Sequence, residues 1–405
     1  MEANHVVRSA SQDPIVLRAG RGAYSAPDYL PQLDGIRAVA IFAVMLAHFL
    51  PIDFLISRVA QWGRLGVVLF FTLSGFLITG ILLGYRDFSA SGRGSPWTGL
   101  RVFYIRRFLR IFPVYYLTLG VLALGGYQYV RQYFLWHVSY TSNISIAHFG
   151  GLYGYSVHLW SLCVEEQFYL IWPCLVIFTP KRALGKVTLG VIAGSLVFKT
   201  VGSLAGMSAV AATFTLFGCL DSLALGALLA ICRHEGWVNS KTLARFAWGG
   251  FFLGLPFMAF MQILIARSGI KVAASAPYVA FMDLATALIF APFLQNAASR
   301  STDLVGRALS WAPLRYVGKI SYGVYIFHYF LVPACQNVFR RMGWNMPDRG
   351  LATFCICTAL AVALASISWH VLESPLNGLK RHFQFGQASS ASSRRESLPE
   401  AAQAA

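Results

Sequence analysis

The sequence predicts an all-α membrane protein with about ten transmembrane helices, and three observations support this: an apolar composition, long apolar runs and asymmetric loop charge. Hydrophobic residues make up 57% of the 405 residues and charged residues only 12%. A soluble domain carries about twice this charged fraction. So much apolar surface would leave large exposed patches in water. The composition therefore excludes an ordinary soluble enzyme, a disordered chain and a small disulfide scaffold.

Ten apolar runs approach the length of about 20 residues that a helix needs to cross a bilayer. Their expected limits are 33–50, 65–84, 108–126, 160–180, 184–204, 213–232, 244–266, 278–297, 318–337 and 350–372. Most are bounded by Arg, Lys, Pro or Gly. Gly and Pro inside these runs are compatible with membrane helices, because neighbouring helices satisfy the freed backbone groups.

The loop charges predict the orientation of these spans. If both termini face the cytoplasm, the inner loops and tails hold 22 Lys and Arg residues and the outer loops hold 8. Such an excess on the cytoplasmic side follows the positive-inside rule. We therefore expect a multi-pass protein of the cell (inner) membrane with both termini in the cytoplasm.

Three regions follow from this pattern. Residues 1–32 are polar, lack the apolar core of a signal peptide, and are expected to form a cytoplasmic tail. Residues 33–380 form the predicted transmembrane domain, in which the loop 127–159 is rich in aromatic residues and is expected to form a surface cap. Residues 381–405 are rich in Ser, Ala and Gln and are expected to form a disordered cytoplasmic tail.

The basic excess and the cysteines do not indicate nucleic acid or metal binding. The formal net charge is +17, but the basic residues are spread through short loops and form no long stripe. The 7 cysteines are odd in number and form no Cys-x-x-Cys pair, so neither a disulfide framework nor a zinc site is predicted.

Ionisable groups inside a span are costly and are candidate functional residues. Arg37 and His48 lie 11 residues apart in the first span, which is 20° more than three helical turns. They therefore share one helix face, separated by about 16 Å along the axis. Alternatively, Arg37 extends to the membrane surface and His48 is an ordinary interfacial residue.

Three arginines mark the cytoplasmic start of the third span. Arg106 and Arg110 are one turn apart, and Arg107 lies beside them. Guanidinium groups bind phosphate oxygens in a fork geometry, so this cluster would suit a phosphate-rich ligand. Simple anchoring at the membrane surface is the alternative, although Arg110 falls within the span.

Two adjacent carboxyl groups, Glu165 and Glu166, lie near the outer end of the fourth span, which begins at Trp160 and Ser161. Ser161 and Glu165 share a helix face. These glutamates either tie helices together through hydrogen bonds or orient a catalytic histidine.

The ninth span carries a polar stripe of Ser321, Tyr325 and His328. Such residues also serve as hydrogen-bond partners between membrane helices. Glu373 lies at the cytoplasmic end of the last span and is a candidate partner for Arg37.

Three further charged residues fall inside spans, and we interpret them as paired or facing a water-filled cavity. They are Lys199, Asp221 and Asp283.

Five segments together resemble acyltransferase family 3, the multi-span membrane O-acyltransferases that modify bacterial cell-surface glycans. The segments are LDGIR at 33–37 with ten residues before His48, the run from Gly66 to Ile78 that contains FFTLSGFLI, the block 106–113, WSL through EEQFY at 160–169, and ISY at 320–322 through His328 with ESP at 373–375. The order and spacing agree over about residues 29–380. The family's usual Arg between Glu and Pro is Ser374 here, which removes one cation beside Glu373.

The resemblance implies an acyl-CoA donor, most often acetyl-CoA, that enters from the cytoplasm, and an acceptor hydroxyl on a surface polysaccharide, lipopolysaccharide or lipid-linked sugar. It implies no bound cofactor and no metal. With the residue pattern, it suggests His48, Glu165 and Glu166 as catalytic residues. His48 would deprotonate the acceptor, and Glu165 or Glu166 would either fix the imidazole tautomer or bind the sugar. Donor-binding candidates are Arg37, Arg106, Arg107, Arg110 and Glu373. Acceptor-binding candidates are Trp160, Ser161, Tyr325 and His328.

Several alternatives stay open at the level of sequence. The protein could export a glycan or lipid without catalysis, or acylate a small-molecule hydroxyl. The acyl chain length is undetermined. An acyl-histidine or acyl-tyrosine intermediate is an alternative to direct transfer.

Overall fold

The computed structural model describes residues 29–150, 154–268 and 275–383, whose regular secondary structure is entirely helical, with no strand among them. The tails predicted at 1–32 and 381–405 fall largely outside the described residues. Nine helices in the described part are long and apolar enough to cross a membrane, which confirms an all-α polytopic membrane protein. They are α1 (Pro31–Phe49), α3 (Trp62–Ala90), α4 (Pro96–Leu124), α8 (Trp160–Phe178), α9 (Lys181–Leu204), α11 (Leu216–Glu235), α12 (Ser240–Ser268), α14 (Ala276–Ala298) and α19 (Leu351–Ser368).

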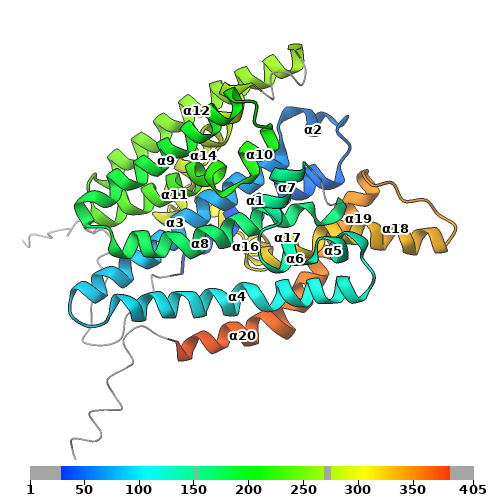
Figure 1. The fold of residues 1–405 in the computed structure, drawn as a ribbon, viewed down its shortest axis with the longest axis horizontal. Coiled ribbons are helices and arrows are strands. Elements are labelled where there is room, and N and C mark those ends of the chain that lie inside the picture. Colours follow the sequence, from blue (N-terminus) through cyan, green and yellow to red (C-terminus); the bar gives the residue numbers. More distant parts are fainter. Residues whose placement is uncertain (1–28, 151–153, 269–274, 384–405) are drawn as a thin grey trace, which may run out of the picture.

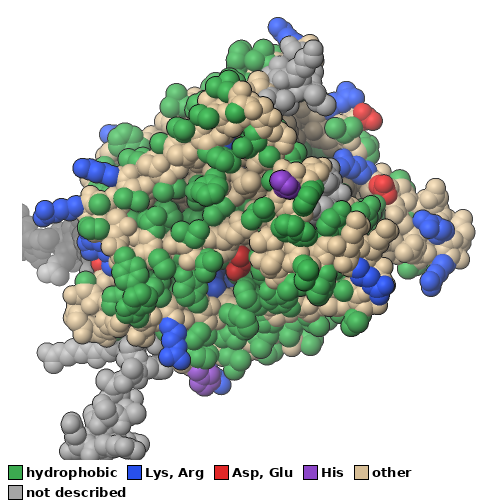
Figure 2. All heavy atoms as spheres, in the orientation of Figure 1, with side chains coloured by type: hydrophobic (Ala, Val, Ile, Leu, Met, Phe, Trp, Pro, Cys, Tyr) green, Lys and Arg blue, Asp and Glu red, His purple; other side chains and the backbone are tan. Residues whose placement is uncertain are grey.

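The helices are arranged around α1 and α3. The helices α9, α11, α12 and α14 pack together on one side, and α4 lies on the opposite side with α20 (Ser374–Gly378) beside it (Figure 1). Figure 2 shows apolar side chains spread over the viewed face, with acidic and basic side chains near its middle. Exposed residues such as Leu170, Leu253 and Val201 lie on spanning helices, where lipid is the expected neighbour.

The ninth predicted span, 318–337, is not one continuous helix. The chain there forms α16 (Ala312–Lys319), α17 (Ser321–Phe327), the 3₁₀ turn η2 (His328–Phe330) and α18 (Leu331–Arg341). Pro333 lacks the N–H that would bond to the carbonyl of Tyr329, so a regular helix is weakened at this point. The turn begins only at His328, and the rings of Tyr325 and His328 remain neighbours, with centroids 5.6 Å apart.

The loop predicted to form a cap, residues 127–159, folds into short helices in its described parts, 127–150 and 154–159. These are α5 (Gln128–Gln132), α6 (Phe134–Val138), α7 (Ser142–Phe149) and η1 (Gly154–Leu159). Tyr115 and Tyr116 of α4 donate hydrogen bonds to the carbonyls of His137 and Val138, at 2.8 and 2.9 Å. Burial lowers the pKa of His137 to about 4, so this imidazole is neutral at pH 7 and serves in packing.

The remaining short helices connect the spans. They are α2 (Leu55–Val59), α10 (Ala209–Phe214), α15 (Leu304–Leu309), the π-helical turn η3 (Trp369–Glu373) and the 3₁₀ turn η4 (Leu379–His382). Glycines allow several helices to approach closely. A Cβ on Gly318 would lie 1.7 Å from the carbonyl oxygen of Asp34, which brings α16 directly against α1.

The closest crossing of spanning helices, between α3 and α11, provides a test of the fold. A Cβ on Gly75 would lie 1.8 Å from the carbonyl oxygen of Leu223, whereas one on Gly80 of the same helix would meet nothing within 4 Å. Gly75→Ala should therefore lower the stability by about 1–3 kcal/mol through overpacking, and Gly80→Ala should not. Thermal unfolding of both variants in detergent measures this. Equal melting temperatures for the two variants would contradict the crossing.

Candidate active site

Two cavities lie at opposite ends of the α1 face that carries Arg37 and His48. We call them the histidine cavity, which contains His48, and the arginine cavity, which contains Arg37. The prediction that these two side chains share a face is consistent with this arrangement, because one helix lines both spaces. The separation along the axis is about 16 Å.

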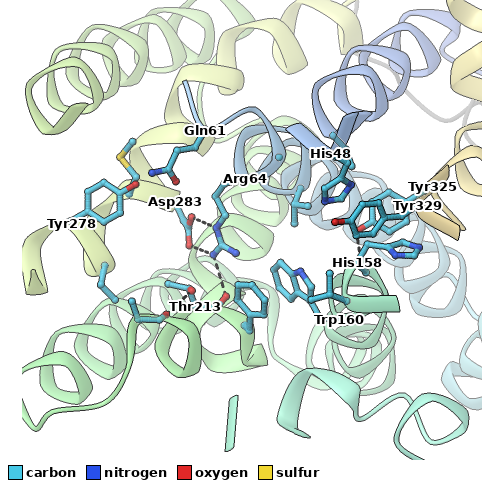
Figure 3. Close-up of a pocket in the computed structure, with 18 of the residues that line it drawn as sticks. His48, Gln61, Arg64, His158, Trp160, Thr213, Tyr278, Asp283, Tyr325 and Tyr329 are labelled. Carbon is cyan, nitrogen blue, oxygen red and sulfur yellow. Dashed lines mark hydrogen bonds and ion pairs between the residues drawn. The ribbon is translucent and has the colours of Figure 1, made fainter. Parts of the chain in front are cut away.

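The histidine cavity has a volume of about 440 Å³, within the range of about 300–1,000 Å³ that is usual for ligand sites. Its polar lining comes from His48, Gln61, Arg64, His158, Trp160, Thr213, Tyr278, Asp283, Tyr325, Tyr329 and Arg349 (Figure 3). Trp160 is stacked on Phe214 with ring centroids 4.1 Å apart. The cavity thus combines an aromatic wall with several hydrogen-bonding groups.

The imidazole of His48 lies in a stack of rings. Its Nδ1 is 2.8 Å from Nε2 of His328, and the ring of Tyr329 covers it at a centroid distance of 4.3 Å. His158 meets His328 edge-on at 4.9 Å. His328, predicted as an acceptor-binding residue, is therefore a direct partner of His48.

A buried charge network forms one wall of the histidine cavity. Arg64 of α3 binds Asp283 of α14 through two nitrogens, with Nε at 2.7 Å from Oδ1. Lys199 of α9 lies 2.6 Å from Asp221 of α11 and 3.8 Å from Asp283. The pairing predicted for Lys199, Asp221 and Asp283 is confirmed.

Arg64 is a cavity residue that the sequence reasoning missed. It stands directly before the apolar run at 65–84, and a charge at that position is indistinguishable from a membrane-surface anchor. In the structure its guanidinium also lies over the Trp160 ring, 5.4 Å from the centroid, so it joins the aromatic wall to the charge network (Figure 3).

The arginine cavity is smaller, about 90 Å³, and gathers the predicted charged residues from three helices. Its lining includes Arg37, Arg107, Arg110, Glu165 and Glu166. Arg37 pairs with Asp34 at 2.5 Å. Within the described part of the chain, no carboxylate lies within 4.0 Å of the guanidinium of Arg107 or Arg110.

Glu165 is bound to a serine of α3. Its Oε1 accepts a hydrogen bond from Ser74 at 2.6 Å, and Ser74 in turn accepts one from the hydroxyl of Tyr169 at 3.0 Å. The hypothesis that Glu165 orients the His48 imidazole is therefore not supported, because His328 occupies that position and both glutamates line the other cavity. Ser74 and Tyr169 belong to the motif segments but were not singled out from the sequence.

Two other predicted donor-binding residues lie outside the arginine cavity. Arg106 donates hydrogen bonds to the carbonyls of Lys380 and Phe383, at 3.3 and 3.2 Å, because it is one turn nearer the start of α4 than Arg110. Glu373 accepts a hydrogen bond from Ser368 at 3.0 Å. The pairing of Glu373 with Arg37 was wrong, since Asp34 of the same helix binds that arginine.

The two cavities meet at Val67 and Tyr325, which line both. The hydroxyl of Tyr325 donates to the carbonyl of His158 at 2.9 Å and lies 2.5 Å from Oγ of Ser161. Of the predicted acceptor-binding residues, Trp160 lines the histidine cavity, Ser161 lines the arginine cavity and Tyr325 lies between them. The wall that separates the cavities is thus about one side chain thick at this point.

The fold and the two cavities define a polytopic membrane protein with a basic chamber, an imidazole chamber and a narrow partition between them. Residues 30–369 match the acyltransferase domain that characterises acyltransferase family 3, and the chain belongs to this family. This confirms the resemblance inferred from the five sequence segments.

Curated relatives carry names from this family. The chain is 28% identical over 396 residues to peptidoglycan O-acetyltransferase OatA of Listeria monocytogenes, covering 88% of this chain and 57% of that protein. It is 27% identical to the putative peptidoglycan O-acetyltransferase YrhL of Bacillus subtilis, covering 86% and 55% respectively. The O-acetyltransferase OatA of Staphylococcus aureus is also 27% identical, with 87% and 58% covered. The chain therefore spans little more than half the length of these relatives. No solved structure matches it.

The charge network makes a stability prediction. Lys199→Met leaves the buried Asp221 without its cation, and breaking a buried pair in this way costs about 3–5 kcal/mol. The double variant Lys199→Met/Asp221→Leu removes both charges and leaves Asp283 with Arg64, so it should recover most of the loss. Thermal unfolding in detergent compares the two. If Lys199→Met were as stable as the unsubstituted protein, this result would contradict the network.

Proposed function

We propose that this protein is a membrane O-acyltransferase that moves an acyl group, most simply acetyl, from acyl-CoA to a hydroxyl of a cell-surface glycan. The observation that supports this most directly is the position of Tyr325 between the two cavities. A donor held by arginines on one side and a hydroxyl beside His48 on the other side would meet there. Family membership and the names of the relatives support the same reaction class.

The arginine cavity suits the donor. Arg107 and Arg110 have no carboxylate partner among the described residues, so their N–H groups are available to phosphate oxygens, which guanidinium groups bind well. Arg37 extends the same surface along α1. The phosphates of CoA would remain at this end, and the thioester would reach the partition at Val67 and Tyr325.

The histidine cavity suits the acceptor. Aromatic side chains, including Trp160, Phe214 and the tyrosines, provide apolar surface, and Gln61, Thr213 and Arg349 offer polar contacts, a combination that sugar rings use. The relatives' names indicate peptidoglycan or a related glycan as the acceptor. In the proposed orientation this cavity opens toward the outer side of the cell membrane and both termini are cytoplasmic.

The proposed reaction is a direct transfer. Neutral imidazole is a suitable base near pH 7. His48 takes the proton of the acceptor hydroxyl, the oxygen attacks the thioester carbonyl carbon, and the carbon–sulfur bond breaks. The proton then passes from His48 to the departing thiolate, which leaves CoA with a free thiol and the glycan with a new ester.

His48→Ala should lower transfer by about 100-fold or more, because general-base catalysis contributes about 10²–10⁴. Donor binding should persist, because the arginine cavity is unchanged. The measurement is transfer of label from acetyl-CoA to glycan by the purified protein, with binding followed separately. His148→Ala, which lines neither cavity, is the matched control. Full activity of the His48 variant would remove this residue from the reaction.

The same assay distinguishes the enzyme from the alternative, a carrier that exports a glycan or lipid. Protein in vesicles is given labelled acetyl-CoA inside and a glycan acceptor outside. Ester formation supports the acyltransferase. Movement of the glycan without ester formation in the unsubstituted protein would support the carrier.

The arginine cavity leads to a second prediction. It changes the role of Arg106, which the sequence suggested as a donor-binding residue. Arg110→Gln should raise the KM for acyl-CoA by about tenfold or more, because a hydrogen bond to a charged group contributes about 1.5–3 kcal/mol. Arg106→Gln should have a much smaller effect, since its guanidinium binds backbone carbonyls outside the cavity. Steady-state kinetics at saturating acceptor measure both, and equal increases would contradict this assignment.

A further inference from the structure

The hydrogen bonds of His328 determine which of its nitrogens carries a proton. Its Nδ1 lies 2.7 Å from the backbone carbonyl oxygen of Tyr325. A carbonyl oxygen only accepts hydrogen bonds, so Nδ1 must be the donor. A neutral imidazole carries one N–H, and Nε2 of His328 is therefore an acceptor with a free lone pair.

The same reasoning applies to His48. Its Nδ1 lies 2.8 Å from Nε2 of His328. Because that nitrogen is an acceptor, Nδ1 of His48 carries the proton and donates. Nε2 of His48 then bears the free lone pair. The stacking of Tyr329 on the ring at 4.3 Å limits its rotation, so the orientation of this lone pair is defined as well as its location.

We propose that His328 is the positioning residue for His48: the chain from the Tyr325 carbonyl through His328 holds His48 as the tautomer whose Nε2 is the base. This inference rests on the proposed function, in which His48 deprotonates the acceptor. A backbone carbonyl and a second imidazole here take the place that a carboxylate takes in a Ser-His-Asp triad.

The surroundings explain why a neutral partner suits this site. The groups that face His48 are His328, Tyr329, His158, Tyr325 and the exposed Arg349, and Figure 3 shows His158, Tyr325 and Tyr329 beside it. The single carboxylate that lines the histidine cavity in the described residues is Asp283, which Arg64 and Lys199 already bind. No anion therefore holds a proton on His48. The proton that Nε2 takes from the acceptor hydroxyl is readily released to the thiolate.

Two amide variants of His328 separate this role from simple packing. The Gln amide reaches as far as Nε2 of histidine, so His328→Gln can still accept from Nδ1 of His48. The Asn amide reaches only as far as Nδ1, so His328→Asn keeps the contact with the Tyr325 carbonyl and loses the one with His48. A wrong tautomer costs up to about 10⁴ in a serine protease.

We expect His328→Asn and His328→Ala to lower kcat by about 30-fold or more, with the KM for acyl-CoA unchanged, and His328→Gln to stay within about fivefold of the unsubstituted protein. His370→Asn is the control, because His370 also bonds a helix carbonyl through Nδ1, at 2.8 Å from Ser366, but is exposed and lines neither cavity. Equal losses in the Asn and Gln variants, or none in either, would overturn the proposal.

A spectroscopic measurement tests the tautomer without relying on catalysis. The chain has 9 histidines, and ¹⁵N resonances of histidine-labelled protein in lipid nanodiscs report which ring nitrogen carries a proton. The His48 signal, assigned by its loss in His48→Gln, should show a protonated Nδ1 and an unprotonated Nε2, and His328→Asn should produce a mixture.

A protonated Nε2 in the unsubstituted protein would overturn the proposal. If His48 shows the predicted tautomer but the protein transfers no acyl group, the result would contradict the proposed function instead. The two failures are therefore distinguishable.

Discussion

A polar side chain inside a bilayer is stable only when a neighbouring helix supplies its partner, and this constraint underlies the arrangement described here. Lys199 is fully buried and is held by Asp221 and Asp283 from two other helices. Asp283 also binds Arg64 of α3. These contacts bring α3, α9, α11 and α14 together around one wall of the histidine cavity. The cavity is therefore a consequence of satisfying buried charges.

The separation of the two chambers depends on one tyrosine. Tyr325 is held by the carbonyl of His158 and by Ser161, so its ring occupies a defined place between the arginines and the imidazoles. In the proposed reaction, this keeps the donor phosphates and the acceptor in separate spaces, and only the thioester reaches the partition. Excluding water from the meeting point would limit hydrolysis of the thioester.

The helical segment 312–341 carries polar side chains that contact two other helices. Tyr325 and His328 are neighbours, with ring centroids 5.6 Å apart, and the 3₁₀ turn η2 begins at His328. Tyr325 contacts Ser161 of α8, whereas His328 reaches His48 on α1. Irregular backbone inside a membrane domain is tolerated where it is buried within the protein, and here it borders the histidine cavity.

The amino-acid sequence was enough to predict the membrane fold, nine of the ten expected helices, the family and the shared face of Arg37 and His48. These features depend on composition, on periodicity within one helix and on motif order, all of which are local. The partner of His48, the place of Arg106 outside the arginine cavity and the contribution of Arg64 were decided by tertiary structure. His48 and His328 are 280 residues apart, and helical periodicity says which residues share a face but not which other helix that face meets. Helix packing, which depends on close contacts such as that of Gly318 with Asp34, determines which helix the face of His48 meets.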